Sequence, residues 1–99
     1  MTVTLESVGN IDHGQNPNKP KMGASKNNSV KVNSFLEAKQ KCMDFIDKND
    51  LGGGNWSGGL IMDDNNKGIA HVCYNGRVWE GASWTKDTKE ITNLNRNTI

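Results

Sequence analysis

The strongest constraint on the fold is one amphipathic stretch, residues 34–49, that carries both a start signal and a stop signal. Ser34 and Glu37 have the spacing of a capping box, in which the serine hydroxyl accepts a first-turn amide hydrogen and the glutamate reaches back toward the cap. After the helix, Leu51 and Gly52 predict the stop, with glycine in the left-handed conformation and leucine packed back on the core. Between the two signals, apolar residues at helical spacing form one face: Phe35, Ala38, Cys42, Phe45 and Ile46. We therefore expect a helix over residues 34–49.

Beyond this helix the apolar pattern changes from a period near 3.6 to a period of 2. Residues 57–81 alternate as a meander of antiparallel strands, and residues 30–33 alternate as a short strand. Residues 2–8 could add an edge strand. The sequence thus predicts an α+β fold in which one helix packs on a small antiparallel sheet.

The first 29 residues differ from the rest of the chain. Residues 9–29 are rich in Asn, Lys, Gly and Pro and show no apolar periodicity. Such a segment has little to bury, so we expect a mobile N-terminal arm. The remaining residues, 30–99, then form a single small domain.

The pair Asn75-Gly76 fixes how the last two strands of the meander align. An Asn-Gly pair favours a two-residue type I′ turn, because both turn positions need a positive φ. With that turn, Val72 lies opposite Trp79 and His71 lies opposite Glu80, and opposed residues share a face. One face then carries Val72, Tyr74, Arg77 and Trp79. The other face is mostly aliphatic and suits the helix: Leu60, Met62, Ile69, Cys73 and Val78.

The aromatic face is the predicted binding surface. Tyr, Trp and Arg are enriched in interface cores, and one helix covers only one side of a sheet. We expect a non-enzymatic protein that engages another protein, or a second copy of itself, through this face. The predicted partner-binding residues are Tyr74, Arg77, Trp79, Val72 and, in the glycine-rich run, Trp56. The alternative is that this face is a second half of the core, covered by the N-terminal segment.

Two other functions are compatible with the same residues. A binder of single-stranded nucleic acid or of nucleotides could stack bases on Trp56, Tyr74 and Trp79, with Arg77 and Lys67 supplying charge. Nucleic acid is not favoured, because 12 basic and 11 acidic residues leave a net charge of only +1. A small Cys/His enzyme is the third interpretation, since the predicted pairing brings together His71, Glu80 and Cys73.

The glycine-rich run at residues 51–59 is not a phosphate loop. It follows the C-terminus of the predicted helix, where the helix dipole repels anions. We interpret it as a flexible link that positions Trp56. Two histidines and two cysteines lack the short paired spacing of zinc sites, so no metal and no cofactor are expected.

The chain has no apolar run long enough to span a membrane and no signal-peptide pattern at its start. We expect a cytoplasmic protein with reduced cysteines. Residues 30–81, and above all the "YNGRVW" hairpin, resemble small bacterial domains carried by phages, plasmids and other mobile elements. That resemblance implies a short accessory or inhibitor protein acting on another macromolecule.

Overall fold

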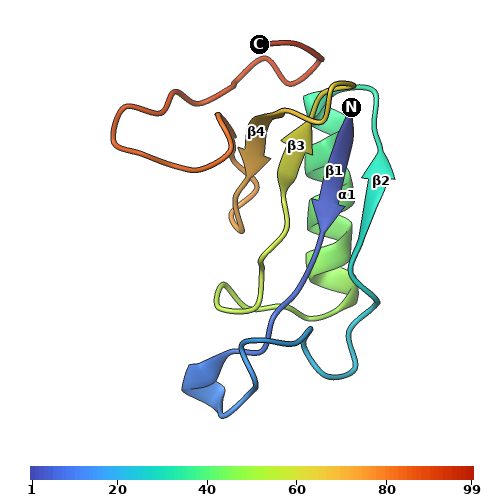
Figure 1. Ribbon diagram of the computed structural model, residues 1–99, viewed down its shortest axis with the longest axis vertical. Helices are drawn as coiled ribbons and strands as arrows, with labels where there is room; N and C mark the ends of the chain where they lie inside the picture. The colour runs from blue at the N-terminus through green and yellow to red at the C-terminus, as the bar shows by residue number, and fades with distance from the viewer.

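A computed structural model describes residues 1–99 and shows one α-helix packed against one side of a five-stranded antiparallel sheet (Figure 1). The α+β architecture expected from the sequence is confirmed. The strands lie in the order β2-β1-β3-β4-β5. The elements are β1 (Thr2–Leu5), a short 3₁₀ turn η1 (Ile11–His13), β2 (Asn28–Lys31), α1 (Phe35–Lys48), β3 (Leu60–Met62), β4 (Gly68–Val72) and β5 (Val78–Glu80).

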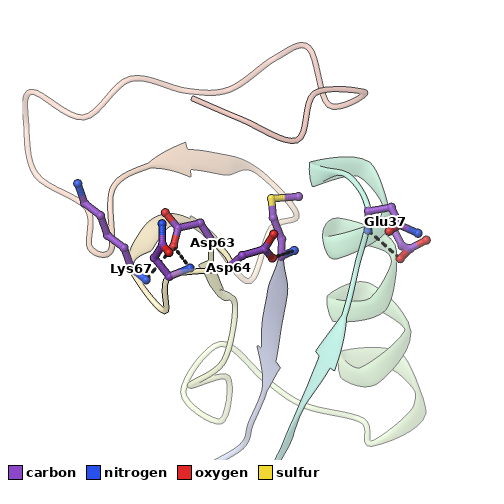
Figure 2. A network of polar contacts seen from close by, with 7 residues as sticks. Glu37, Asp63, Asp64 and Lys67 are labelled. Atoms are coloured by element: carbon purple, nitrogen blue, oxygen red, sulfur yellow. Dashed lines mark hydrogen bonds and ion pairs between the residues drawn. The ribbon is translucent and has the colours of Figure 1, made fainter.

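The helix begins as the capping box predicts. Ser34 is the N-cap, and its Oγ accepts a hydrogen bond from the Glu37 amide at 3.2 Å. The Glu37 carboxylate in turn accepts the amide hydrogen of Asn33 at 3.1 Å, one residue before the cap (Figure 2). One first-turn donor, the Glu37 amide, is thereby paired, while the glutamate binds the residue before the cap and not the cap itself. The predicted range of 34–49 agrees with α1 and its two caps.

The C-terminal tail completes this helix start. The amide of Phe35 donates to the carbonyl of Arg96 at 2.9 Å, and the amide of Leu36 donates to the carbonyl of Leu94 at 2.7 Å. Earlier in the tail, the amide of Ile91 donates to the carbonyl of Val78 in β5, and Ile91 is only 3% exposed. The tail therefore extends the sheet edge and then satisfies the helix amides that the serine does not reach.

The helix ends in a Schellman motif that uses an aspartate where the sequence suggested a glycine. Asp50 has a φ of 51°, and its amide donates to the carbonyl of Asp47 at 3.2 Å. The Leu51 amide donates to the carbonyl of Ile46 at 3.0 Å. Leu51 is 4% exposed and packs on the core as expected, whereas the expectation of a left-handed Gly52 is wrong.

The core lies between α1 and the sheet face that it covers. Fourteen buried apolar residues form one cluster, which suits the modest core of a chain of this length. The helix supplies Phe35, Ala38, Cys42, Phe45 and Ile46, as the periodicity predicted. The sheet supplies Val3 and Leu5 of β1, Ile61 of β3, Ala70 and Val72 of β4, and Val78 of β5.

Strand β1 is an inner strand and not the edge strand considered from the sequence. Val3 pairs with Val30 on one side and with Ile61 on the other. The pairing is antiparallel on both sides, and β2 forms the sheet edge. Val3 is fully buried under the helix. An inner position suits such a strand, because both of its sides then have hydrogen-bonding partners.

The arm between β1 and β2 is bound to the domain by hydrogen bonds. Lys21 reaches the end of α1, where its Nζ donates to the carbonyls of Asn49 at 3.2 Å and Asp50 at 2.9 Å. The Lys21 amide donates to Ser7 Oγ at 3.0 Å, and the Ser25 amide donates to Asn49 Oδ1 at 2.7 Å. These contacts are polar, so they require no regular spacing of apolar residues. The sequence of the arm therefore does not indicate that it is bound to the domain.

The β3–β4 connection is closed by an aspartate. One oxygen of Asp63 accepts the backbone amides of Asn65 at 2.9 Å and Lys67 at 3.0 Å (Figure 2). The neighbouring Asp64 accepts from the ammonium of Met1 at 3.3 Å, but its side chain is 92% exposed. Lys67 therefore contributes its backbone amide and carbonyl to this turn.

Candidate functional site

The β4–β5 hairpin turns through three residues and not two. The Cys73 amide donates to the carbonyl of Arg77, and the Gly76 amide donates to the carbonyl of Cys73, both at 2.9 Å. Gly76 has a φ of 87°, whereas Asn75 is not among the residues with positive φ. This is a type I turn followed by a left-handed glycine, so the predicted type I′ turn is wrong.

This turn shifts the strand register by one residue. Val72 pairs with Val78, His71 with Trp79, and Ala70 with Glu80. A one-residue shift in register exchanges the two faces of one strand relative to its partner, so each side chain joins the opposite side of the sheet. As a consequence Glu80 does not face His71, and Trp79 does not face Val72.

The helix accordingly covers the β4 face that carries Val72, which the sequence analysis left free, whereas Val78 of β5 lies beneath the helix as expected. Val72 is 2% exposed and Val78 is 1% exposed, both in the core beneath α1. Ile61 is fully buried beside them. Leu60 and Met62, expected beneath the helix, alternate with Ile61 and point to the opposite side.

The five predicted partner-binding residues do not gather on one surface. Val72 belongs to the core, so it offers nothing to a partner. Trp56 packs against Phe45 with ring centroids 6.2 Å apart, and its Nε1 donates to the carbonyl of Val72 at 3.1 Å. Tyr74 is 43% exposed at the turn, Arg77 is exposed, and Trp79 is half-buried on the face away from the helix. The three-ring stacking surface expected from the sequence therefore does not form.

The glycine-rich run is closely packed, which differs from the flexible link expected. A Cβ at Gly58 would lie 2.6 Å from the carbonyl oxygen of Thr4, and one at Gly59 would lie 2.2 Å from that of Val72. Gly59 also has a φ of 98°. These contacts require glycine, because real Cβ atoms do not approach so closely. The run positions Trp56 as predicted, but through tight backbone contacts.

The sheet side away from α1 is the main candidate surface, and we call it the open face. Strand pairing places eight side chains on it: Thr2, Thr4, Ser29, Lys31, Leu60, Met62, His71 and Trp79. Cys73, the residue after Val72, follows by alternation. Ser29 and Lys31 at the β2 edge are exposed, the other side chains are half-buried, and no second helix or sheet lies over them (Figure 1). The chain just beyond β5 borders this face, since a Cβ at Gly68 would lie 3.1 Å from both Leu60 and Ala82.

His71 and Cys73 share the open face, but without the partners that nucleophilic catalysis uses. His71 Nδ1 lies 2.8 Å from the carbonyl oxygen of Gly81, and its enclosed Nε2 has no hydrogen-bond partner. Because a carbonyl only accepts, Nδ1 carries the proton. Burial raises the pKa of the Cys73 thiol, partly offset by a hydrogen bond with the Trp79 side chain. Burial also raises the pKa of Cys42 to about 12. Neither thiol is therefore activated.

One set of residues that the sequence analysis missed lies where the arm meets the glycine-rich run. Asn55 is 6% exposed, and its Nδ2 donates to the carbonyl of Val8 and to Gln15 Oε1, both at 2.9 Å. Gln15 Oε1 also accepts the Asn10 amide at 2.8 Å. The sequence signal for these contacts was the high density of Asn in residues 9–29. These residues recur at no regular spacing, so the sequence does not indicate which residue each one contacts.

No three His, Cys, Asp or Glu side chains gather in a group that could hold a metal ion. No helix has the length and apolar character needed to cross a membrane. In comparisons with protein-family models, with curated proteins and with solved structures, the chain gives no match.

Proposed function

We propose that the protein is a non-enzymatic binding protein that engages another protein through the open face. The observation that supports this is the single-sided covering of the sheet. Leu60, Met62 and Trp79 present apolar surface on the side without a helix. Apolar surface of this kind on a small domain marks an interface when it forms a continuous patch.

Trp79 is the expected centre of that interface. It is half-buried, it lies opposite His71 of β4 in the register, and its backbone pairs with Glu90 on the other side. A tryptophan that is already held by its neighbours loses little conformational freedom on binding, which favours a high contribution to affinity. Tyr74 and Arg77, both exposed at the adjoining turn, extend the proposed surface at its end.

A second copy of the chain could occupy the same face in place of another protein. The accessory or inhibitor role implied by the resemblance to mobile-element domains fits either occupant, because both act by covering a partner's surface. With either occupant, the open face is the proposed binding surface and the proposed role is binding without catalysis.

The test compares Trp79→Ala with Trp84→Ala. Trp84 is 59% exposed in the loop after β5, so it controls for the loss of an exposed ring that is not on a strand of the open face. A partner is first captured from host extract, and its affinity is then measured with the purified wild type and variants. We expect Trp79→Ala to weaken binding by about 2 kcal/mol or more and Trp84→Ala to leave it unchanged. Light scattering applies the same comparison to self-association.

Met62→Lys provides a second variant in case Trp79→Ala unfolds. Met62 is half-buried on the open face, and a lysine there can extend its charge into water while disrupting an apolar contact. Normal binding and normal sizing by folded Met62→Lys and Trp79→Ala would show that the interface lies elsewhere.

A further inference from the structure

A polar cleft lies where the arm, the end of α1 and the hairpin turn meet. Its volume is about 520 Å³, and the lining residues used below are Asn10, Gln15, Lys21, Asp50 and Tyr74. That volume falls within the range of about 300–1,000 Å³ that small-molecule sites occupy. A cavity of similar size at the other end of the sheet has no aromatic residue in its lining.

The cleft presents amide donors in fixed orientations. The Gln15 Oε1 oxygen accepts two hydrogen bonds, from the Asn10 amide and from Asn55 Nδ2. The Asn10 Oδ1 oxygen accepts the Asp12 amide at 3.0 Å. An amide whose oxygen is pinned by N–H donors must present its NH₂ group elsewhere. The NH₂ groups of Asn10 and Gln15 have no partner in the protein, so both remain available to a ligand.

Contacts with neighbouring segments hold these donors in place in the folded protein. A Cβ at Gly54 would lie 2.4 Å from Asn10 Nδ2, so glycine is needed for Asn10 to sit where it does. Lys21 bonds the arm to the last carbonyls of α1. Donors held in place before a ligand arrives lose little entropy on binding.

Tyr74 supplies the one aromatic wall. Its ring lies beside Gly53, where a Cβ would be 3.7 Å from Tyr74 Cδ1, and the residue is 43% exposed. Its hydroxyl has no hydrogen-bond partner in the protein. An exposed ring with a polar tip next to fixed amides suits a ligand that has both apolar C–H surface and hydroxyl groups.

The charges argue against an anionic ligand. The cleft borders the C-terminal end of α1, which carries the negative end of the helix dipole, and the Asp50 carboxylate adds a second negative group. The Lys21 ammonium is directed to the carbonyls of Asn49 and Asp50. A phosphate would therefore meet repulsion here, whereas a neutral hydroxyl can donate to Asp50 and accept from Asn10 or Gln15.

We propose that this cleft binds a neutral sugar unit of a glycan. One face of the sugar ring packs on Tyr74, the NH₂ groups of Asn10 and Gln15 donate to its hydroxyl oxygens, and the Asp50 carboxylate accepts a sugar hydroxyl. Tyr74 borders both this cleft and the end of the proposed protein-binding surface, but no other residue of the cleft lies on the open face. Sugar binding here therefore does not depend on the protein binding proposed there.

The test uses a glycan array, with the biotinylated protein presented on streptavidin so that several copies bind together. Glycans bound on the array are then titrated into ¹⁵N-labelled protein, and amide shifts are followed by NMR. We expect shifts at the cleft residues in the wild type. Tyr74→Ala should weaken binding by about tenfold, since an aromatic contact contributes roughly that much. Asp50→Asn should also weaken it, because the amide presents only one acceptor oxygen.

Trp84→Ala is the matched control, because it removes an exposed ring outside the cleft. Uridine monophosphate is titrated alongside to probe the nucleotide alternative. Four results would overturn the proposal: no glycan bound on the array, shifts confined to residues outside the cleft, unchanged affinity in folded Tyr74→Ala, or tighter binding of uridine monophosphate than of any array glycan at these residues.

Discussion

Asp50 is held in a backbone conformation that glycine adopts more easily. Its φ of 51° lies in the left-handed region, and its carboxylate sits at the negative end of the α1 dipole. We expect Asp50→Gly to raise the free energy of unfolding by about 1 kcal/mol, measured by urea denaturation. The backbone carbonyl that accepts from Lys21 is kept in this variant.

Asp50→Asn separates the two causes. Asparagine tolerates the left-handed region and removes the charge, so it should give a smaller gain than glycine. If the glycine variant were no more stable than the wild type, Asp50 would not be strained in solution.

We expect the buried thiol of Cys42 to make the fold less stable in alkaline solution. Its pKa rises from 9.0 in its ordinary state to about 12 in the fold. Below pH 9 both the folded and unfolded chains keep the proton, so its full contribution is present. Between pH 9 and about pH 12 only the unfolded chain loses it, and stability falls by up to about 1.4 kcal/mol per pH unit.

The measurement is the thermal midpoint as a function of pH, in the wild type and in Cys42→Ala. The variant should be less stable throughout, because it leaves a cavity, but its midpoint should fall less steeply above pH 9. Parallel curves for the two proteins would show that Cys42 does not cause the alkaline loss.

At the scale of elements, the hairpin turn decides which face of the sheet is covered. Tyr74→Pro distinguishes the observed turn from a two-residue type I′ turn. Tyr74 is the second residue of the four-residue turn Cys73–Gly76, a position that favours proline, and its amide makes no hydrogen bond in the protein. We expect Tyr74→Pro to change the free energy of unfolding by less than about 1 kcal/mol, or to raise it.

In a two-residue turn the same amide would belong to the strand ladder, and proline would disrupt it. Urea denaturation with near-ultraviolet circular dichroism measures the outcome. A large destabilisation by Tyr74→Pro would favour the two-residue turn and would return Val72 to the surface.

The start of α1 gives a second prediction for an element. Ser34→Ala should lower the free energy of unfolding by about 1 kcal/mol, because the Glu37 amide loses its side-chain acceptor. Removing residues 93–99 should instead speed hydrogen exchange at Phe35 and Leu36, whose amides bond to carbonyls in that segment. Equal exchange rates at these two amides with and without the segment would mean that the tail does not cap the helix in solution.

The helix was predictable because each of its signals is local. The capping box and the spacing of Phe35, Ala38 and Cys42 do not depend on tertiary contacts. The covered sheet face was not predictable, because it depends on a single backbone choice. Asn75-Gly76 fits a turn with one left-handed residue as well as a turn with two, and the extra loop residue reverses the faces of β4 relative to β5.

At the scale of the whole molecule, little of the chain is in the core. Only 19 of 99 residues are buried, yet the radius of gyration of 13.1 Å matches the roughly 13 Å of a folded chain of about 100 residues. The arm is therefore folded against the domain, and polar contacts such as those of Lys21 hold it there. The sequence could not show this, because hydrogen bonds leave no apolar pattern.

The arm should open more readily than the core, because it is held without apolar burial. Lys21→Met should speed hydrogen exchange at Ser25, whose amide donates to Asn49 at the end of α1, and at Gly9, whose amide donates to Lys19 within the arm. It should leave the core amides of β1 slow. Lys19→Met is the matched control, since the Lys19 side chain makes no hydrogen bond in the protein. Identical exchange in both variants would show that Lys21 does not hold the arm.

The inner position of β1 also bears on how the protein is made. Val3 leaves the ribosome before Val30 and long before Ile61, yet it pairs with both. At about 5–20 residues per second, β1 waits some seconds for its second neighbour. A nascent chain stalled before β3 should thus be digested by protease, and resistance should arise only once residues 60–80 have been translated.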